Sequence, residues 1–201
     1  PFILSRGVMK TINNYLSKLH SVVEAIPLAD VQTLAETLKN IWQENKQVFI
    51  CGNGGSAANA IHLANDLFFG IAKKSNFHGL RVHALPANQS ITTCLANDIS
   101  YDDIYSEQIK AYANNGDVLI ALSGSGNSPN IVKVILTAKE MGMQTFAILG
   151  YSGGKCLGLV DTAIHCKVDD MQMAEDAQVI IGHSIMQWLQ ENPPERQQKN
   201  E

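Results

Sequence analysis

The chain has no long hydrophobic run, few aromatic residues and no block of like charge. Its 201 residues are 45% hydrophobic and 6% aromatic, yet no apolar segment is long enough to span a bilayer, and no secretory signal is recognised. The net charge is -4 and the basic residues are scattered, which does not predict a nucleic-acid-binding surface. We therefore expect a cytoplasmic protein with neither a membrane nor a nucleic acid as partner.

Cysteine is also sparse. Cys51, Cys94, Cys156 and Cys166 form no C-x-x-C pair, so neither a cysteine zinc site nor a dithiol redox motif is predicted. Two of them, Cys51 and Cys166, lie in apolar runs typical of strands. We expect buried free thiols in a reducing compartment.

The two ends of the chain are expected to lie outside the fold. Residues 1–8 precede a Met9-Lys10 pair that is typical of a native start, so we interpret them as an expression-vector remnant. Residues 192–201 are rich in proline and charge, which is typical of a disordered tail. Residues 9–191 are then expected to form one domain.

Apolar runs alternate with helical patterns, which predicts an α/β fold. The runs cover about 47–51, 81–86, 118–122, 145–149 and 162–168. Helices are expected between and after them, at about 57–70, 90–95, 101–114, 131–141, 155–160 and 173–190, with a loop at 96–100. This alternation is typical of a doubly wound parallel five-stranded sheet flanked by helices.

Two amphipathic segments, about 9–25 and 28–45, precede the first run. They have no strand before them to cover. They pack either on the outside of the sheet or against another subunit.

The most informative loop follows the apolar run 118–122. It reads Ser123-Gly-Ser-Gly-Asn-Ser128 and leads into Pro129, which suits the first turn of a helix with Ser128 as N-cap. A helix N-terminus with backbone N–H groups, several hydroxyls and flexible glycines is a natural phosphate site. The alternative is an ordinary strand-to-helix turn.

A second loop repeats this arrangement. The run 47–51 leads into Gly52-Asn-Gly-Gly-Ser56 and a helix. Ligands of such sheets bind beyond the carboxyl ends of the strands, so both loops are expected to face one pocket. A dinucleotide fingerprint is not supported, because the next strand ends in Ala84-Leu85-Pro86 without the acidic residue that would hold the ribose. Gly154-Lys155 does not complete a P-loop either.

Four residues outside the loops have side chains that can bind a metal or exchange protons. His62 and Asp66 are four residues apart, so on a helix they share one face and can bind a metal, exchange protons or simply be surface polarity. An unbroken helix would separate Glu175 from His183 by about 12 Å, so the two could bind one metal only if the helix starts after Glu175 or if one of them reaches the site of a neighbouring subunit. The apolar neighbours of His183 favour a core histidine.

The motifs Cys51-Gly-Asn-Gly-Gly-Ser56, Ala96-Asn-Asp98 and Leu122-Ser-Gly-Ser-Gly-Asn-Ser128 resemble the SIS (sugar isomerase) domain family, and within it the phosphoheptose isomerases. The resemblance implies a flavodoxin-like fold and a homotetramer with sites at subunit interfaces, in which the two N-terminal helices build the assembly. It implies that a phosphorylated sugar is bound by Asn53, Gly54, Ser56, Asp98, Ser123, Gly124, Ser125, Asn127 and Ser128. Without the resemblance, Asp98 is equally a turn residue or an N-cap.

The resemblance also implies an activity. Asp66 would act as the base and His183 as its acid/base partner in an aldose–ketose isomerisation through an enediol, with a metal, commonly zinc, on His62, Asp66, Glu175 and His183. The expected substrate is sedoheptulose 7-phosphate, a precursor of lipopolysaccharide or capsule heptose.

This chain departs from the family pattern at four of these positions or their neighbours. It has Asp66 where the family has Glu, Glu175 where it has Gln, Gln172 where an acidic residue is expected, and no Arg beyond Asp66. The alternative function is a non-catalytic SIS tetramer that binds a phosphosugar or a protein partner, as the initiator-associating protein DiaA does.

Overall fold

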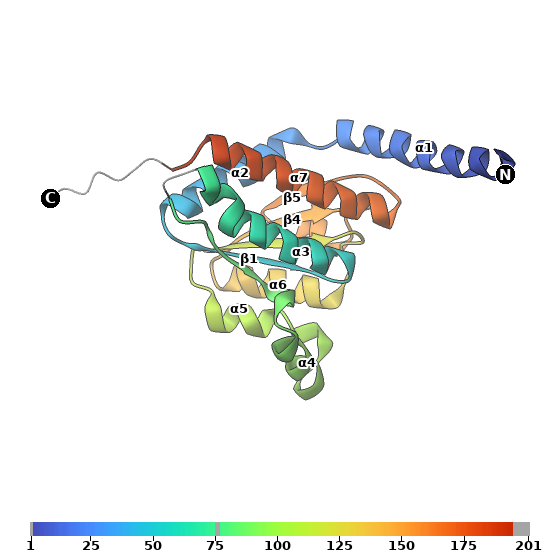
Figure 1. The fold of residues 1–201 in the computed structure, drawn as a ribbon. Coiled ribbons are helices and arrows are strands. Elements are labelled where there is room, and N and C mark those ends of the chain that lie inside the picture. Colours follow the sequence, from blue (N-terminus) through green and yellow to red (C-terminus); the bar gives the residue numbers. More distant parts are fainter. Residues whose placement is uncertain (1, 75–76, 195–201) are drawn as a thin grey trace.

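The computed structural model describes residues 2–74 and 77–194, and its centre is a parallel sheet of five strands (Figure 1). The strands are β1 (Gln47–Gly52), β2 (Arg81–Ala84), β3 (Val118–Ser123), β4 (Gln144–Leu149) and β5 (Thr162–His165). Their order is β2-β1-β3-β4-β5, and every neighbouring pair is parallel. This is the flavodoxin-like order of doubly wound sheets, so the predicted fold class is confirmed.

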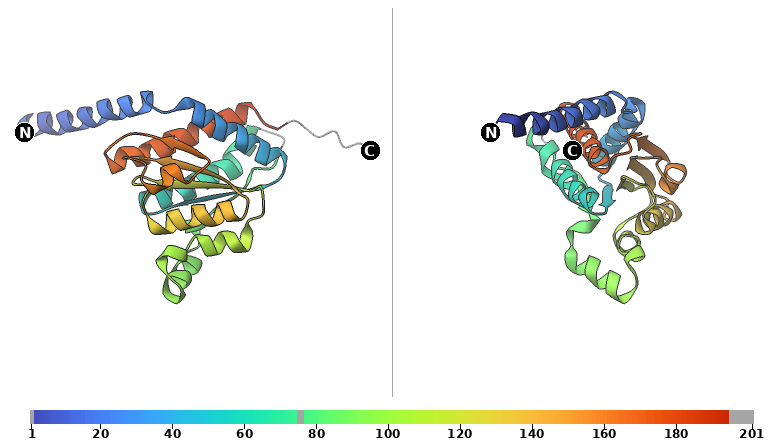
Figure 2. Two further views of the ribbon diagram at one scale, coloured as in Figure 1. Left: turned by 180° about the vertical axis from the view of Figure 1, so that it is seen from behind. Right: turned by 90° about the vertical axis from the view of Figure 1, so that its right-hand side faces the viewer.

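The alternation of side chains along the strands divides the core into two layers. In β1, Val48 and Ile50 face a cluster that includes α2 (Leu28–Gln43), α3 (Gly55–Asn65) and α7 (Met171–Glu191). Phe49 and Cys51 face the opposite cluster, which includes α5 (Ser106–Tyr112) and α6 (Pro129–Glu140). All six residues of β1 and of β3 are buried, as expected for central strands covered on both faces. Figure 2 shows the two helical layers on either side of the sheet.

The two N-terminal helices have different surroundings. Helix α2 covers the sheet of its own chain and buries Leu34, Leu38 and Trp42. Helix α1 (Phe2–Glu24) extends away from the body of the molecule (Figure 1) and leaves apolar side chains such as Leu16 exposed. Its C-terminal half packs on α7, where the Tyr15 hydroxyl donates a hydrogen bond of 2.5 Å to Asp176.

Several predicted element boundaries are wrong. Helix α3 ends at Asn65 and the chain continues as a π-helical turn, Asp66–Gly70, and a 3-10 turn, Ile71–Lys74. Helix α4 (Gln89–Asp98) runs through most of the segment predicted as the loop 96–100. Helix α7 starts two residues earlier than predicted because the Asp170 side chain accepts a hydrogen bond from the backbone N–H of Met173 as its N-cap.

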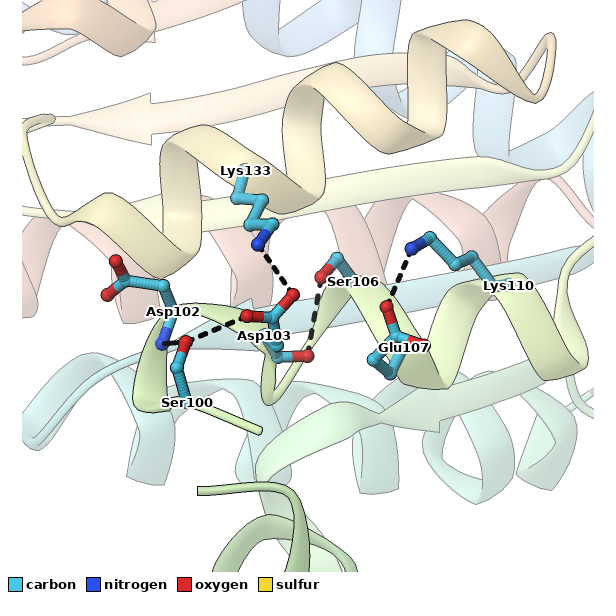
Figure 3. Close-up of polar contacts among 7 residues, drawn as sticks. All are labelled: Ser100, Asp102, Asp103, Ser106, Glu107, Lys110 and Lys133. Carbon is cyan, nitrogen blue, oxygen red and sulfur yellow. Dashed lines mark hydrogen bonds and ion pairs between the residues drawn. The ribbon is translucent and has the colours of Figure 1, made fainter. Parts of the chain in front are cut away.

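The helix predicted at 101–114 is interrupted. It begins as a 3-10 turn, Tyr101–Asp103, and restarts as α5 at Ser106. The Ser100 hydroxyl accepts a hydrogen bond from the backbone N–H of Asp102 and donates one of 2.7 Å to Asp103. Asp103 also forms an ion pair of 2.6 Å with Lys133 on α6 (Figure 3). These contacts lower the pKa of Asp103, and the contact with Lys133 has the largest effect. They also hold the start of this segment against α6.

The predictions for the ends and for the cysteines have mixed outcomes. Helix α1 begins at Phe2 and includes residues 2–8 of the segment interpreted as a remnant, whereas Pro1 lies outside the described residues. Most of the predicted tail, residues 195–201, lies outside the described residues. All four cysteines are free thiols, but Cys94 is exposed while the other three are buried. Of the helices in the described part of the chain, none has the length and hydrophobicity that a membrane crossing requires.

Candidate functional site

Both small-residue loops line one pocket at the carboxyl end of the sheet. Strands β1 and β3 are neighbours, and the helices that follow them, α3 and α6, lie on opposite faces of the sheet. This is the switch point at which doubly wound sheets bind ligands. The pocket has about 100 Å³ of water-accessible space and is lined by Asn53, Ser56, Leu122, Ser123, Gly124, Ser125, Ser128, Met171 and Glu175.

The serine hydroxyls are arranged to donate hydrogen bonds to a ligand. The Ser123 oxygen accepts a hydrogen bond of 3.0 Å from the backbone N–H of Gly126, and the Ser125 oxygen accepts one of 3.3 Å from that of Asn127. Ser128 occupies the N-cap position of α6 but its side chain makes no cap hydrogen bond. A hydroxyl whose oxygen already accepts within the loop still has its proton to donate. Phosphate oxygens accept such protons.

A contact between α3 and α7, which the sequence analysis missed, orients a fourth hydroxyl. The fully buried Gln178 donates a hydrogen bond of 3.0 Å to the Ser56 oxygen, and its own oxygen accepts one of 2.9 Å from Asn59. The Ser56 proton is therefore left for the pocket. No local pattern marks Gln178, because its partners are more than one hundred residues away in the chain.

The Asn53 amide is held rigidly at the rim. Its side chain exchanges two hydrogen bonds with that of Asn130, at 2.9 and 2.8 Å. The hydroxyls of Tyr101 and Tyr105 donate to the Asn53 oxygen at 3.3 and 3.4 Å. Tyr105 also donates to the carbonyl of Gly52, and its burial raises its pKa. Asn53 therefore lines the pocket and is held in place by residues from two other segments.

Three of the residues assigned to sugar binding do not line this pocket. Asn127 directs its amide to the backbone of Ser125 and accepts from the backbone N–H of Lys155, so it braces one loop against another. Asp98 is exposed at the end of α4, where a hydrogen bond from Asn97 is the main cause of its lowered pKa. Gly54 adopts a positive φ of 56° at the start of α3 and is also absent from the lining.

Farther along α3 and α7 lies a compact group of His62, Asp66 and His183. The Nε2 atoms of the two histidines are 2.8 Å apart. The Asp66 Oδ2 atom lies 3.5 Å from the nitrogen of His62 and 3.3 Å from that of His183. The Asp66 side chain is only 14% exposed, whereas those of His62 and His183 are 49% and 43% exposed. The interpretation of His183 as a core histidine is wrong.

The donor set of this group fits a zinc ion. Two imidazoles and one carboxylate are the protein ligands of a common class of catalytic zinc site, which leaves a fourth position for water or substrate. Ligand atoms around a tetrahedral zinc lie about 3.3 Å apart if the zinc–nitrogen distance is about 2.0–2.1 Å. The two distances from Asp66 have this value, and the distance between the histidines is somewhat shorter.

Glu175 does not belong to this group of three. Helix α7 is unbroken between Glu175 and His183, and eight residues of helix advance about 12 Å. The Glu175 carboxylate lies instead in the loop pocket, against Gly55 at the start of α3. Within one chain, the predicted set of four metal-binding residues is therefore a set of three.

The π-helical turn begins at Asp66, where α3 ends. Such turns are rare and occur often at functional sites. Nothing in the local sequence distinguishes this turn from a continued α-helix, which is why the sequence analysis extended the helix to Gly70.

The chain resembles known proteins over most of its length. A family model described as the SIS domain matches residues 12–150. The phosphoheptose isomerase of Geotalea daltonii is 36% identical over 184 residues, which are 91% of this chain and 88% of that protein. The phosphoheptose isomerase of Chlorobaculum parvum is 33% identical over 177 residues, 88% of this chain and 85% of that protein.

The fold likeness extends to solved structures. The structure of a phosphoheptose isomerase from Neisseria gonorrhoeae matches with a TM-score of 0.84 at 25% identity, covering 92% of this chain and 99% of that one. The likeness thus spans both the sheet and the helices that carry the pocket and the histidine group.

Proposed function

Because the chain belongs to the SIS-domain family, and within it to the phosphoheptose isomerases, we propose that it interconverts sedoheptulose 7-phosphate and the corresponding aldose phosphate. It is a phosphosugar isomerase, and the reaction is an aldose–ketose isomerisation through an enediol. The observation that carries the assignment of residues is that α3 and α7 contribute both to the serine-lined pocket, through Ser56 and Glu175, and to the histidine–aspartate group, through His62 and His183.

The serine pocket binds the phosphate. Ser123, Ser125 and Ser128 offer hydroxyl protons, and the N-terminus of α6 adds the positive end of its dipole. The water-accessible space of about 100 Å³ is well below the roughly 300 Å³ or more of typical small-molecule sites. It therefore holds the phosphate end of the ligand, and the rest of the sugar lies outside it.

The distance between the pocket and the histidine group suits a long sugar. From Ser56 to His62, α3 advances about 9 Å, and from Glu175 to His183, α7 advances about 12 Å. With bonds of about 1.5 Å and angles of about 111°, the eight bonds from a phosphorus on C7 to C1 span about 10 Å when extended. The length of a seven-carbon sugar phosphate is thus similar to the separation, along α3 and α7, between Ser56 or Glu175 in the pocket and the histidine group.

At that end, Asp66 and His183 divide the proton transfers. The Asp66 carboxylate removes the proton from C1 of the ketose and returns it to C2, which gives the aldose. His183 donates a proton to the C2 oxygen and removes one from the C1 oxygen, so that the enediol forms and collapses without net change in protons. General acid–base catalysis of this kind contributes about 10²–10⁴-fold in rate.

His62, Asp66 and His183 would also hold a zinc ion, which would stabilise the enediolate oxygens as a Lewis acid, in place of the proton that His183 donates in the metal-free protein. His62 has no other assigned role in the reaction. Its Nε2 faces the same point as the other two ligand atoms, which supports a ligand role for it. Of the larger predicted set, Glu175 is not proposed as a ligand within the same chain.

The test is turnover of sedoheptulose 7-phosphate with and without added zinc. The variant Asp66→Asn should lose about 10²–10⁴-fold in kcat and still bind the substrate, because the serine pocket is untouched. Asp30→Asn, in the first turn of α2, is the control and should keep full activity. Absence of turnover of this and of related sugar phosphates by the wild-type protein would refute the proposal.

The remaining family properties are part of the same proposal. The homotetramer is supported by the exposed apolar side chains of α1, and a cytoplasmic location and a role in heptose biosynthesis accompany the activity. A wild-type protein that binds sugar phosphate without turnover would favour the alternative, a non-catalytic binding protein.

A further inference from the structure

Helices α3 and α7 pack against each other, and their contacts advance in the same direction along both helices (Figure 1). Near the start of α7, the Asn59 amide of α3 donates hydrogen bonds to the carbonyl of Glu175 and to the side chain of Gln178. One turn farther along both helices, Leu63 of α3 packs on Gly182 of α7. The two helices therefore approach each other most closely at a residue without a side chain.

The packing at Gly182 leaves no room for a side chain. A Cβ atom there would lie 2.2 Å from Cδ2, 2.8 Å from Cδ1 and 3.0 Å from Cγ of Leu63, whereas nonbonded carbon atoms normally stay about 3.5–4.0 Å apart. Leu63 is itself buried, with only 5% of its surface exposed. A glycine inside a helix is normally less favourable than an alanine, so the close packing gives the physical reason for glycine at this position.

This contact lies directly beside the histidine group. Leu63 follows His62 on α3, and Gly182 precedes His183 on α7. The two imidazole rings meet edge to face, with their centroids 5.0 Å apart and their Nε2 atoms 2.8 Å apart. The Asp66 Oδ2 atom lies 3.5 and 3.3 Å from these two nitrogens. The separation of the two backbones at the glycine therefore sets how close His183 comes to the side chains of α3.

We propose that Gly182 is a positioning residue, because the lack of a side chain there lets Leu63 pack directly on the backbone of α7. This close approach brings His183 within zinc-binding distance of His62 and Asp66. The inference rests on the proposed function, because it takes these three side chains to be the zinc ligands assigned there. Distances between a metal and its ligands vary by only about 0.2 Å, so a small separation of the two helices weakens the site.

Replacing Gly182 with alanine tests the inference. Rotation of the Leu63 methyl groups does not remove the clash, because Cγ also lies 3.0 Å from the new Cβ. The apolar cavity that both residues line has about 20 Å³ of water-accessible space, which is room for about one water molecule. Helix α7 must therefore move away from α3. We expect zinc affinity, measured by calorimetry without substrate, to fall about 10–100-fold, and kcat to fall by a similar factor.

The double variant Leu63→Ala/Gly182→Ala separates positioning from stability. Alanine at position 63 removes the three atoms that the new Cβ would meet, so the helices can approach each other again. It also leaves a cavity in the core, which lowers Tm. We expect zinc affinity to return to that of the single variant Leu63→Ala while Tm stays below that of the wild type. A purely structural role of the glycine would instead make zinc affinity follow Tm.

Gly158→Ala is the matched control, because a Cβ atom on Gly158 meets no atom within 4 Å, and it should change neither zinc affinity nor Tm. If Gly182→Ala does not fold, the double variant decides, and folding with zinc binding restored would support the inference. Wild-type zinc affinity in Gly182→Ala, or no recovery in the double variant, would overturn it. A wild-type protein that binds no zinc would overturn it as well, and the proposed function would then stand or fall by turnover alone.

Discussion

Replacing Gln178 with leucine tests how the pocket is built. Gln178 is fully buried between α3 and α7 and makes two hydrogen bonds, one to the Ser56 hydroxyl and one from Asn59. Leucine has a similar size but no polar group. The loss of two hydrogen bonds at about 1 kcal/mol each, with the Ser56 oxygen left unsatisfied, lowers the free energy of unfolding by about 2–3 kcal/mol. For a domain of this size, Tm falls by roughly 5–10 °C.

The same substitution affects binding. Without Gln178, the Ser56 hydroxyl is no longer oriented to donate into the pocket, and a hydrogen bond to a charged phosphate is worth about 1.5–3 kcal/mol. We expect KM for sedoheptulose 7-phosphate to rise about tenfold or more with kcat within about twofold, because the phosphate is held equally in the ground and transition states. Thermal unfolding and steady-state kinetics measure the two effects.

Gln108 provides a matched control on the other face of the sheet. It is also buried, at 6% exposure, and its amide donates hydrogen bonds to the carbonyls of Leu85 and Ile104. Gln108→Leu should lower Tm by a comparable amount and leave KM unchanged. If both variants raise KM equally, or if Gln178→Leu lowers Tm without changing KM, the assigned role of Gln178 in orienting Ser56 is refuted.

Three further predictions concern the loop, the pH dependence and the metal. Gly126→Ala should lower the free energy of unfolding, measured in urea, by at least about 1 kcal/mol. The reason is that φ at this position is 66° and the new Cβ would lie 2.0 Å from the carbonyl oxygen of Gly153. A variant as stable as the wild type would refute this prediction. Burial lowers the pKa of His83, and the nearby charge of Arg81 lowers it further. The unfolded protein therefore binds more protons at this residue than the folded protein does. The stabilisation that is present above about pH 6.5 is lost as pH falls below that value. His83→Asn should flatten this pH dependence, and an unchanged slope would contradict the assignment. His62→Ala should weaken zinc binding in calorimetry by at least about tenfold, because one of three ligands is removed; equal affinity in the variant and the wild type would exclude His62 as a ligand.

Much of the fold and of the serine-lined pocket could be predicted from local sequence. The strands are short apolar runs, and the two loops of glycine, serine and asparagine follow β1 and β3 directly. In a parallel sheet, the carboxyl ends of all strands lie at the same edge, so the two loops were expected to meet there. In the structure both loops line one pocket. The pairing of His62 with Asp66 was also predictable, since four residues make one helical turn.

The sequence by itself thus determined the fold class, the two loops that line the pocket and the chemical types of the side chains proposed to react, because these depend on neighbours within a few residues. Tertiary structure decided the rest. The packing of α3 beside α7 brought His183 to His62 and Asp66, placed Glu175 in the loop pocket and set Gln178 against Ser56. Each of these contacts joins residues more than one hundred positions apart, and their meeting depends on how two helices pack on the same face of the sheet, which no local pattern encodes.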